Sequence, residues 1–439
     1  MISIKKNTSF LYIICSLLFF SSRTMGQVLQ KQSSSFLNDS VVATGHAGIS
    51  IYEPATGKYL YDYNAEKNFI PSSNLKLFSL YAGLKYLGDS LLGLKYIETD
   101  TSITLIPTGD PTLLHPDFSA QPVFEFLKAT KKNIYLTGNT FKTNMYGNGW
   151  GWNDYPDYYM AERSAFPVYG NCITFNVKKN FISSIPENLS PFIVNTAALQ
   201  KDKEINVERV FFSNTFKVLT DNKTSEIIIT PFITSDSLSA KLLSDSTHKN
   251  ITVVPLPIMG INKKINTIYS RPVDSLFKPM MYNSDNFFAE QTLMMVSNKV
   301  LGYMNETDLI DSLLKTDLKD LPQKPRWVDG SGLSRYNLFT PKDFIYILYK
   351  LQKEFGLERI KRILPTAGMG TLRGYYENAV GSIYAKTGSM SNNVSLSGYL
   401  ISKKNKLLLF SVMINNYSGS GKQGRKAIEK FIQSVRNSY

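Results

Sequence analysis

The sequence predicts an α+β protein in which helices pack on an antiparallel sheet made from both ends of the chain, with a β-rich insert between the ends. Strand patterns at 48–52 and 58–63 have counterparts at 395–401 and 407–413. Helix-type spacing of apolar residues lies beside each pair. Strands from both ends, each with a neighbouring helix, can join one sheet and bury one core. The length of 439 residues allows two or three domains.

The N-terminus has the pattern of a secretory signal peptide. Lys5 and Lys6 precede an apolar run from Phe10 to Phe20, and small and polar residues follow as far as Gly26. The run is too short to span a bilayer comfortably. We therefore predict export, removal of residues 1–26 and a periplasmic or cell-wall location.

Composition excludes several classes of function. The formal net charge is +14, and the chain stays basic after the leader, which leaves open a peripheral association with an anionic wall or membrane surface. The lysines are scattered without an arginine-rich run, so no nucleic-acid partner is predicted. Cys172 is the one cysteine outside the leader, which excludes an internal disulfide, and we interpret it as a small half-buried side chain.

The elements follow in order along the chain. After a polar lead-in at 27–43 and the first strand pair, Pro71 opens a helix with apolar positions from Leu75 to Leu84. A short strand is expected at 383–385, and a helical stripe at 424–435 closes the chain. These segments place the core in residues 27–95 and 267–439.

The middle of the chain has a different residue pattern. Short β-type runs, separated by Asn, Asp, Pro and Ser, recur between the two halves of the core, for example at 103–106, 207–212 and 226–230. We predict that residues 96–266 form one or two inserted β-rich domains, which could be nested.

The first candidate motif is Ser73-Asn74-Leu75-Lys76 at the start of the predicted helix. Residues three apart share a helix face, so the hydroxyl of Ser73 and the amine of Lys76 can meet. A serine needs a base to become a nucleophile, and a lysine acts as a base only when burial or another cation lowers its pKa. The same spacing occurs four more times in the chain, so this motif is weak by itself.

The second motif is Ser284-Asp285-Asn286, followed by an apolar helix. Ser284 could relay a proton, and the amide of Asn286 could bind a substrate carbonyl or hold Lys76. Ser, Asp and Asn before a helix are equally explained as helix caps. Alone, the motif favours a cap.

The third motif, Lys386-Thr387-Gly388-Ser389, follows the short strand predicted at 383–385. A lysine and two hydroxyls on an edge strand can hold a carboxylate. Gly388 would let two backbone segments approach closely. The charge of Lys386 would also lower the pKa of Lys76. This tripeptide occurs once in the chain and is the strongest of the three signals.

The three motifs together, in this order and in these structural contexts, resemble the signature of penicillin-binding proteins and serine β-lactamases. The long separation of the first two motifs resembles the low-molecular-mass class C penicillin-binding proteins, the D-alanyl-D-alanine carboxypeptidase/endopeptidase family S13. Further blocks are similar to this family at 108–113, 149–154, 158–164, 329–335, 364–368 and 370–373. Pro107 and Thr108 depart from it, because glycines are usual there.

The resemblance implies a penicillin-binding, β-lactamase-like transpeptidase core with nested inserts. It implies a serine peptidase that hydrolyses D-Ala-D-Ala ends or D-Ala cross-links of peptidoglycan stem peptides through an acyl-enzyme on Ser73, without a cofactor, and that β-lactams inhibit. Lys76 would be the general base, and the backbone N–H groups of Ser73 and Ser389 would form the oxyanion hole. The other implied site residues are Ser284 and Asn286, for proton transfer and substrate binding, and Lys386, Thr387, Gly388 and Ser389, for the substrate carboxylate.

Alternatives were weighed against this assignment. A zinc peptidase needs clustered ligands, whereas His46, His115 and His248 are far apart, and no metal site is predicted. A class A β-lactamase needs a deacylating glutamate, and we interpret Glu290 as lying on the solvated face of its helix. A wall-binding or β-lactam-sensing protein that acylates without turnover remains the alternative from another class.

Overall fold

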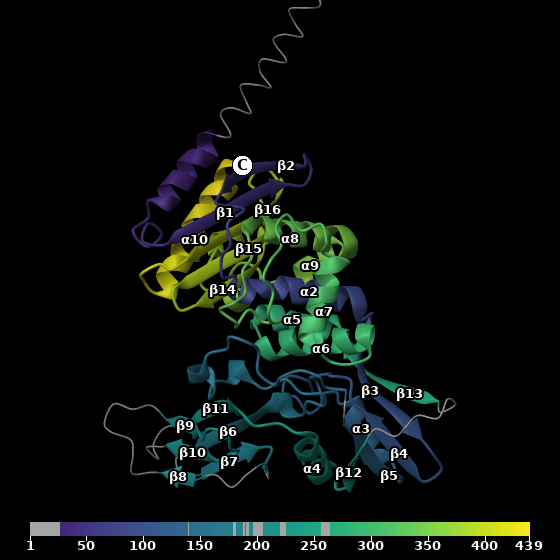
Figure 1. Ribbon diagram of the computed structural model, residues 1–439. Coiled ribbons are helices and arrows are strands. Elements are labelled where there is room, and N and C mark those ends of the chain that lie inside the picture. The colour runs from purple at the N-terminus through teal and green to yellow at the C-terminus, as the bar shows by residue number, and fades with distance from the viewer. Residues whose placement is uncertain are drawn as a thin grey trace, which may run out of the picture. The chain divides into compact units, whose positions relative to one another are not determined.

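The computed structural model describes residues 27–138, 140–178, 181–187, 189, 193–195, 205–219, 225–255 and 264–439. These residues form two compact units (Figure 1). The first unit comprises the described residues up to Leu77, Leu321–Arg326 and Asn337–Tyr439, and the second comprises Phe78–Asp320 and Trp327–Tyr336. The predicted signal peptide lies outside the described residues.

The first unit is built on a five-stranded sheet of order β14-β15-β16-β1-β2, in which every pair is antiparallel. The five strands are β1 (His46–Glu53), β2 (Lys58–Tyr63), β14 (Ile383–Met390), β15 (Asn393–Ile401) and β16 (Leu407–Asn415). His46 lies opposite Asn415, so the purple N-terminal strand β1 and the yellow C-terminal strand β16 run side by side in Figure 1. This confirms the predicted sheet made from both ends of the chain.

Strand β15 shows how alternation separates the two faces of this sheet. Val394 and Leu396 belong to a buried apolar cluster with α10 (Gly421–Ser438). Ser395 and Tyr399 point to the other face, where Tyr399 donates a hydrogen bond to the carbonyl of Leu348 in α8 (Pro341–Phe355). A period of two therefore places a core on one face and polar anchors on the other.

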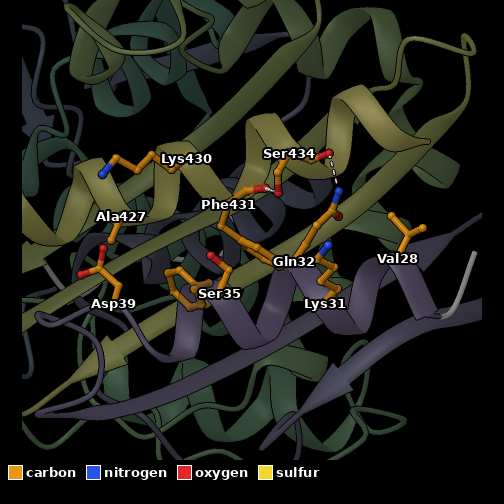
Figure 2. Close-up of a pocket in the computed structure, with 10 residues that line it drawn as sticks. Val28, Lys31, Gln32, Ser35, Asp39, Ala427, Lys430, Phe431 and Ser434 are labelled. Carbon is orange, nitrogen blue, oxygen red and sulfur yellow. Dashed lines mark hydrogen bonds between the residues drawn. The ribbon is translucent and has the colours of Figure 1, made fainter.

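Residues 27–37 form a helix that packs on α10. The rings of Phe36 and Phe431 stack with centroids 4.9 Å apart, and the amide of Gln32 donates to the carbonyl of Ser434 at 2.9 Å. Figure 2 shows the pocket between the two helices. None of the predicted site residues lines this pocket.

The second unit contains three sheets in its described residues. A mixed sheet of order β12-β5-β4-β3-β13 stands beside two three-stranded sheets, β11-β6-β7 and β8-β10-β9. The strands of the mixed sheet are β3 (Ser90–Glu98), β4 (Ser102–Ile106), β5 (Asn133–Thr137), β12 (Ile251–Val254) and β13 (Ile265–Pro272). The others are β6 (Cys172–Lys178), β7 (Phe181–Ile185), β8 (Ile193–Asn195), β9 (Asn206–Arg209), β10 (Phe216–Leu219) and β11 (Glu226–Pro231).

Helices complete both units. The second unit holds α3 (Pro122–Ala129), α4 (Asp236–Thr247), α5 (Asp274–Tyr282), α6 (Asn286–Leu301) and α7 (Glu306–Lys315), and the first holds α9 (Leu357–Ile363). Helix α2 (Lys76–Tyr86) begins in the first unit and continues in the second. No helix among the described residues is long and apolar enough to cross a bilayer.

The structure confirms the α+β class and refines several boundaries. The third motif lies inside β14 rather than after it, and the strand expected at 207–212 ends at Arg209, where a turn begins. Strand β14 is an edge strand, as predicted. The division into a core of 27–95 and 267–439 and an insert of 96–266 stays a prediction.

Candidate active site

The first unit holds six of the eight predicted site residues, and the second unit holds two. Ser73, Lys76, Lys386, Thr387, Gly388 and Ser389 belong to the first unit, and Ser284 and Asn286 belong to the second. The site is therefore described unit by unit.

Ser73 and Lys76 meet as their spacing predicts. Ser73 lies in the short 3-10 helix η1 (Ser72–Leu75), and Lys76 is the first residue of α2. The amine Nζ of Lys76 lies 3.0 Å from the hydroxyl Oγ of Ser73. Lys76 is fully buried. Ser72, just before the serine, has φ of +50°, a left-handed conformation that is uncommon outside glycine.

A second buried lysine faces this pair from β14. Lys386 is fully buried, and its amine donates to the carbonyl of Thr387 at 2.7 Å. Burial lowers the pKa of Lys386 well below the ordinary lysine value, and the nearby charge of Lys76 lowers it further. Two buried lysines that repel each other titrate as a coupled pair, which releases its first proton below the ordinary lysine range.

Gly388 lets β14 approach the turn that carries Ser73. A Cβ built at Gly388 would lie 2.6 Å from the carbonyl oxygen of Pro71 and 2.3 Å from Oγ of Ser395, which real Cβ atoms do not tolerate. Ser395 donates to that same carbonyl at 2.8 Å, and Asn74 donates to Ser397 at 2.7 Å. These bonds fasten η1 to β14 and β15.

The second motif opens helix α6. The carboxylate of Asp285 accepts a hydrogen bond from the N–H of Phe288, so Asp285 is the cap of this helix. Ser284 has φ of +60°, and the amide of Asn286 donates to the carbonyl of Tyr159 at 2.9 Å. The capping interpretation therefore accounts for Asp285 but not for its two neighbours.

A family model described as the D-Ala-D-Ala carboxypeptidase 3 (S13) family matches residues 29–435. The chain belongs to this family. The match covers most of the chain and confirms the resemblance inferred from the three motifs. An S13 chain is an enzyme of the serine-type carboxypeptidase class, as predicted.

Named relatives of this S13 enzyme are consistent with the family assignment. A D-alanyl-D-alanine carboxypeptidase from Actinomadura sp. (strain R39) is 24% identical over 444 residues, which cover 89% of this chain and 81% of that protein. A carboxypeptidase DacB from Haemophilus influenzae is 23% identical, with 86% and 87% covered. The crystal structure of penicillin binding protein 4 (dacB) from Haemophilus influenzae has the same fold, with a TM-score of 0.74, 20% identity and coverage of 92% and 98%.

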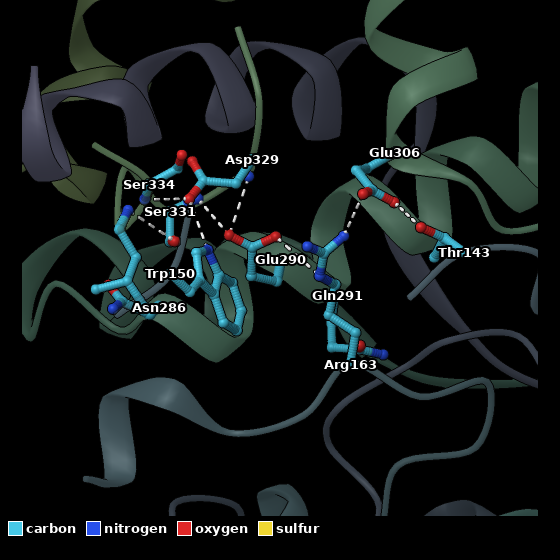
Figure 3. A network of polar contacts seen from close by, with 12 residues as sticks. Thr143, Trp150, Arg163, Asn286, Glu290, Gln291, Glu306, Asp329, Ser331 and Ser334 are labelled. Carbon is cyan, nitrogen blue, oxygen red and sulfur yellow. Dashed lines mark hydrogen bonds and ion pairs between the residues drawn. The ribbon is translucent and has the colours of Figure 1, made fainter. Parts of the chain in front are cut away.

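Glu290 corrects one expectation for this S13 enzyme. It is fully buried in α6 rather than on a solvated face. Its carboxylate accepts the N–H groups of Gly330 and Ser331 at 3.0 and 2.7 Å and pairs with Arg163 at 3.5 Å. Burial raises the pKa of Glu290 to about 7, with Arg163 acting in the opposite direction. Figure 3 shows the network continuing from Arg163 to Glu306, at 2.7 Å.

The loop at 329–334 is tied to the same network. The carboxylate of Asp329 accepts the indole N–H of Trp150 at 2.9 Å and the backbone N–H groups of Gly332 and Ser334 at 2.9 and 2.6 Å (Figure 3). The blocks at 149–154 and 329–335, which carried part of the family resemblance, are thus held together by one carboxylate.

Two arginines, Arg163 and Arg425, were missed by the sequence analysis. Apolar residues surround Glu290 on its helix, and its partner Arg163 is distant in sequence, so no local pattern marks the buried pair. Arg425 in α10 donates to Oγ of Ser389 at 3.0 Å, a contact that depends on how α10 packs. Cys172 is half-buried, as predicted, and desolvation raises the pKa of its thiol to about 12.

Proposed function

We propose that this chain is a serine DD-peptidase that hydrolyses D-Ala-D-Ala ends, D-Ala cross-links, or both, in peptidoglycan stem peptides through an acyl-enzyme on Ser73. The observation that carries the proposal is the 3.0 Å contact between Oγ of Ser73 and the buried amine of Lys76. The relatives named D-alanyl-D-alanine carboxypeptidase support the substrate class.

The chemistry follows from the residues of the first unit. A neutral Lys76 takes the proton of Ser73 as Oγ attacks the carbonyl carbon of the penultimate D-Ala. The C–N bond then breaks, the leaving amine receives a proton, and an ester on Ser73 remains. Water attacks the ester, gives up a proton to the same base and releases the carboxylate product with the free hydroxyl.

The remaining residues have assigned roles within the proposal. Lys76, fully buried beside Lys386, acts as the general base. Ser284 and Asn286 assist proton transfer and hold the substrate amide. Thr387 and Ser389 bind the substrate carboxylate, and the N–H groups of Ser73 and Ser389 stabilise the oxyanion.

β-Lactams would acylate the same serine, because they present a strained amide to the same nucleophile. A β-lactam complex of the Haemophilus influenzae protein supports this part. A structural relative described as Bd3459, a predatory peptidoglycan endopeptidase from Bdellovibrio bacteriovorus, supports cross-link cleavage (TM-score 0.53, 16% identity). We also propose export after removal of residues 1–26, with action at the wall.

The test is intact mass of the purified protein after incubation with penicillin, with Ser73→Ala beside wild type. We expect one adduct on wild type and none on the variant. Equal adducts on both would overturn the assignment of the nucleophile. Product release from a D-Ala-D-Ala peptide then separates a turning-over peptidase from a protein that only acylates.

A further inference from the structure

Arg425 places a guanidinium beside the third motif. It lies in the second turn of α10 and is half-buried. Its Nη1 donates to the hydroxyl of Ser389 at 3.0 Å, and its Nε donates to the hydroxyl of Tyr375 at 3.2 Å. Two hydrogen bonds from one guanidinium fix the direction of the fork.

The polar partners of this arginine are two hydroxyls, and its guanidinium also lies 5.8 Å from the ring centroid of Tyr375. In the described part of the chain no carboxylate lies within ion-pair distance of Arg425, whereas the buried Arg163 has two such partners and Arg209 has one. The adjacent Lys426 is also paired, with Glu429 at 2.5 Å. Among the described residues Arg425 therefore has no ion-pair partner, and it lies at the end of β14, the strand that carries the third motif.

The hydroxyl of Ser389 is oriented by this contact. A serine hydroxyl has one hydrogen to donate and two lone pairs to accept. Arg425 donates to Oγ and occupies one lone pair, so the hydroxyl hydrogen of Ser389 is left to donate to another group, and Ser389 is exposed. A ligand at this place would meet an O–H donor and a guanidinium together, which is the donor set that suits a carboxylate.

We infer that Arg425 is a specificity-determining residue that recognises the free carboxylate of the substrate together with Ser389. The inference rests on the proposed function and adds a residue from outside the three motifs. It also assigns the role of permanent cation to a residue other than the lysines that act in proton transfer. A buried lysine pair that must give up a proton to act as base is a poor permanent cation, whereas an arginine stays charged at every working pH.

The test compares protein variants on two substrates that differ only in the C-terminal group. The kcat/KM is measured for a peptide ending in D-Ala-D-Ala and for the same peptide with a C-terminal amide, using wild type, Arg425→Gln and the control Lys426→Gln. We expect Arg425→Gln to lose roughly 10- to 100-fold on the carboxylate substrate and to change little on the amide. Lys426→Gln, one residue away with its own glutamate, should match wild type on both.

The outcomes separate the two proposals. An equal loss on both substrates would show that Arg425 only supports the local structure, and the inference would fall. If wild type cleaves neither peptide, turnover as proposed fails, and adduct formation with benzylpenicillin and with its methyl ester then provides the comparison. If Arg425→Gln forms the adduct more slowly with benzylpenicillin but not with its methyl ester, the inference is supported. If adduct formation slows equally with both compounds, or if wild type forms no adduct with either, the inference is overturned.

Discussion

Gly388 occupies the point at which β14 passes closest to the turn that carries Ser73. Two polar atoms fill the space that a side chain would need, the carbonyl of Pro71 and Oγ of Ser395. A larger residue must move either the strand or the turn. Because the turn also fixes the 3.0 Å contact between Ser73 and Lys76, this spacing has a catalytic consequence.

We expect Gly388→Ala to slow acylation by penicillin roughly 100-fold, since small misplacements of reacting groups cost about that much. The rate of adduct formation measures it. Gly374→Ala is the matched control, because Gly374 has φ of +77° and open space around its Cβ position. That control should lose stability and keep its acylation rate. Unchanged acylation in Gly388→Ala would contradict the packing argument.

The lysine pair predicts the direction of the pH dependence. Because the pKa of Lys386 lies well below 10.5, the pair releases a proton below the usual lysine range. The acylation rate should therefore rise with pH through that lowered pKa. Stability should rise across the same window, because there the unfolded chain binds the proton that the native pair has lost.

The variant Lys386→Ala tests this prediction. The quantity to compare is the pH at which the acylation rate rises, not the maximum rate. Removing Lys386 removes the group whose pKa is lowered, so the rising limb of the acylation rate should move to higher pH. Rates of penicillin adduct formation between pH 6 and about 10 locate the limb. A limb that stays in place would show that the two lysines are not coupled.

At the scale of elements, α6 is held by charge as well as by apolar packing. Its buried Glu290 accepts two N–H groups of the loop at 329–334 and pairs with Arg163. The helix begins with the second motif, so the same interactions fix the orientation of Ser284 and Asn286 within the second unit. Replacing a buried partner of this kind leaves an uncompensated charge, which is costly.

We expect Glu290→Gln to flatten the pH dependence of stability. The folded pKa of Glu290 is about 7 against a usual 4.5, so its favourable contribution is complete below 4.5 and is lost as pH rises through about 7. Wild-type Tm should thus fall between these pH values more steeply than that of the variant, which cannot ionise. Glu358→Gln, an exposed helix position paired with Lys361, is the control. Parallel Tm curves for wild type and Glu290→Gln would refute this reading.

Elements were easier to predict than partners. The strands at 48–52, 58–63 and 395–401 were visible because period two and turn residues are local properties of the chain. The Ser73–Lys76 contact was visible because helical spacing fixes it. Glu290 was misplaced, because apolar neighbours on all sides of a helix hide which polar residue faces a buried arginine. Arg425 was missed because its contact depends on tertiary packing.

At the scale of the whole molecule, each unit contains an apolar cluster of its own. One contains the sheet of the first unit with α10, and the other contains the sheets of the second unit. Phe36 belongs to the first core and stacks on Phe431, and Phe216 belongs to the second and meets Phe175 at 5.5 Å. Two cores of this kind favour unfolding in more than one step.

We expect calorimetry of the full chain to resolve two transitions. Phe36→Ala should lower only the one belonging to the first unit, and Phe216→Ala only the other, each by about 3–5 kcal/mol in unfolding free energy. Penicillin labelling after partial heating would assign the transitions, because the nucleophile lies in the first unit. A single transition that both variants shift equally would show that the cores unfold together.

The pairing of β1 with β16 determines how early the sheet can form during synthesis. His46 leaves a ribosome long before its partner Asn415 does. The central pair of the sheet therefore cannot close until β16 has been synthesised. Until then β1 has an unpaired edge, which is the surface that a holding chaperone recognises and that aggregation exploits. Lys386 of the third motif is likewise made long after Ser73 and Lys76, so the predicted site cannot assemble before β14 has been synthesised.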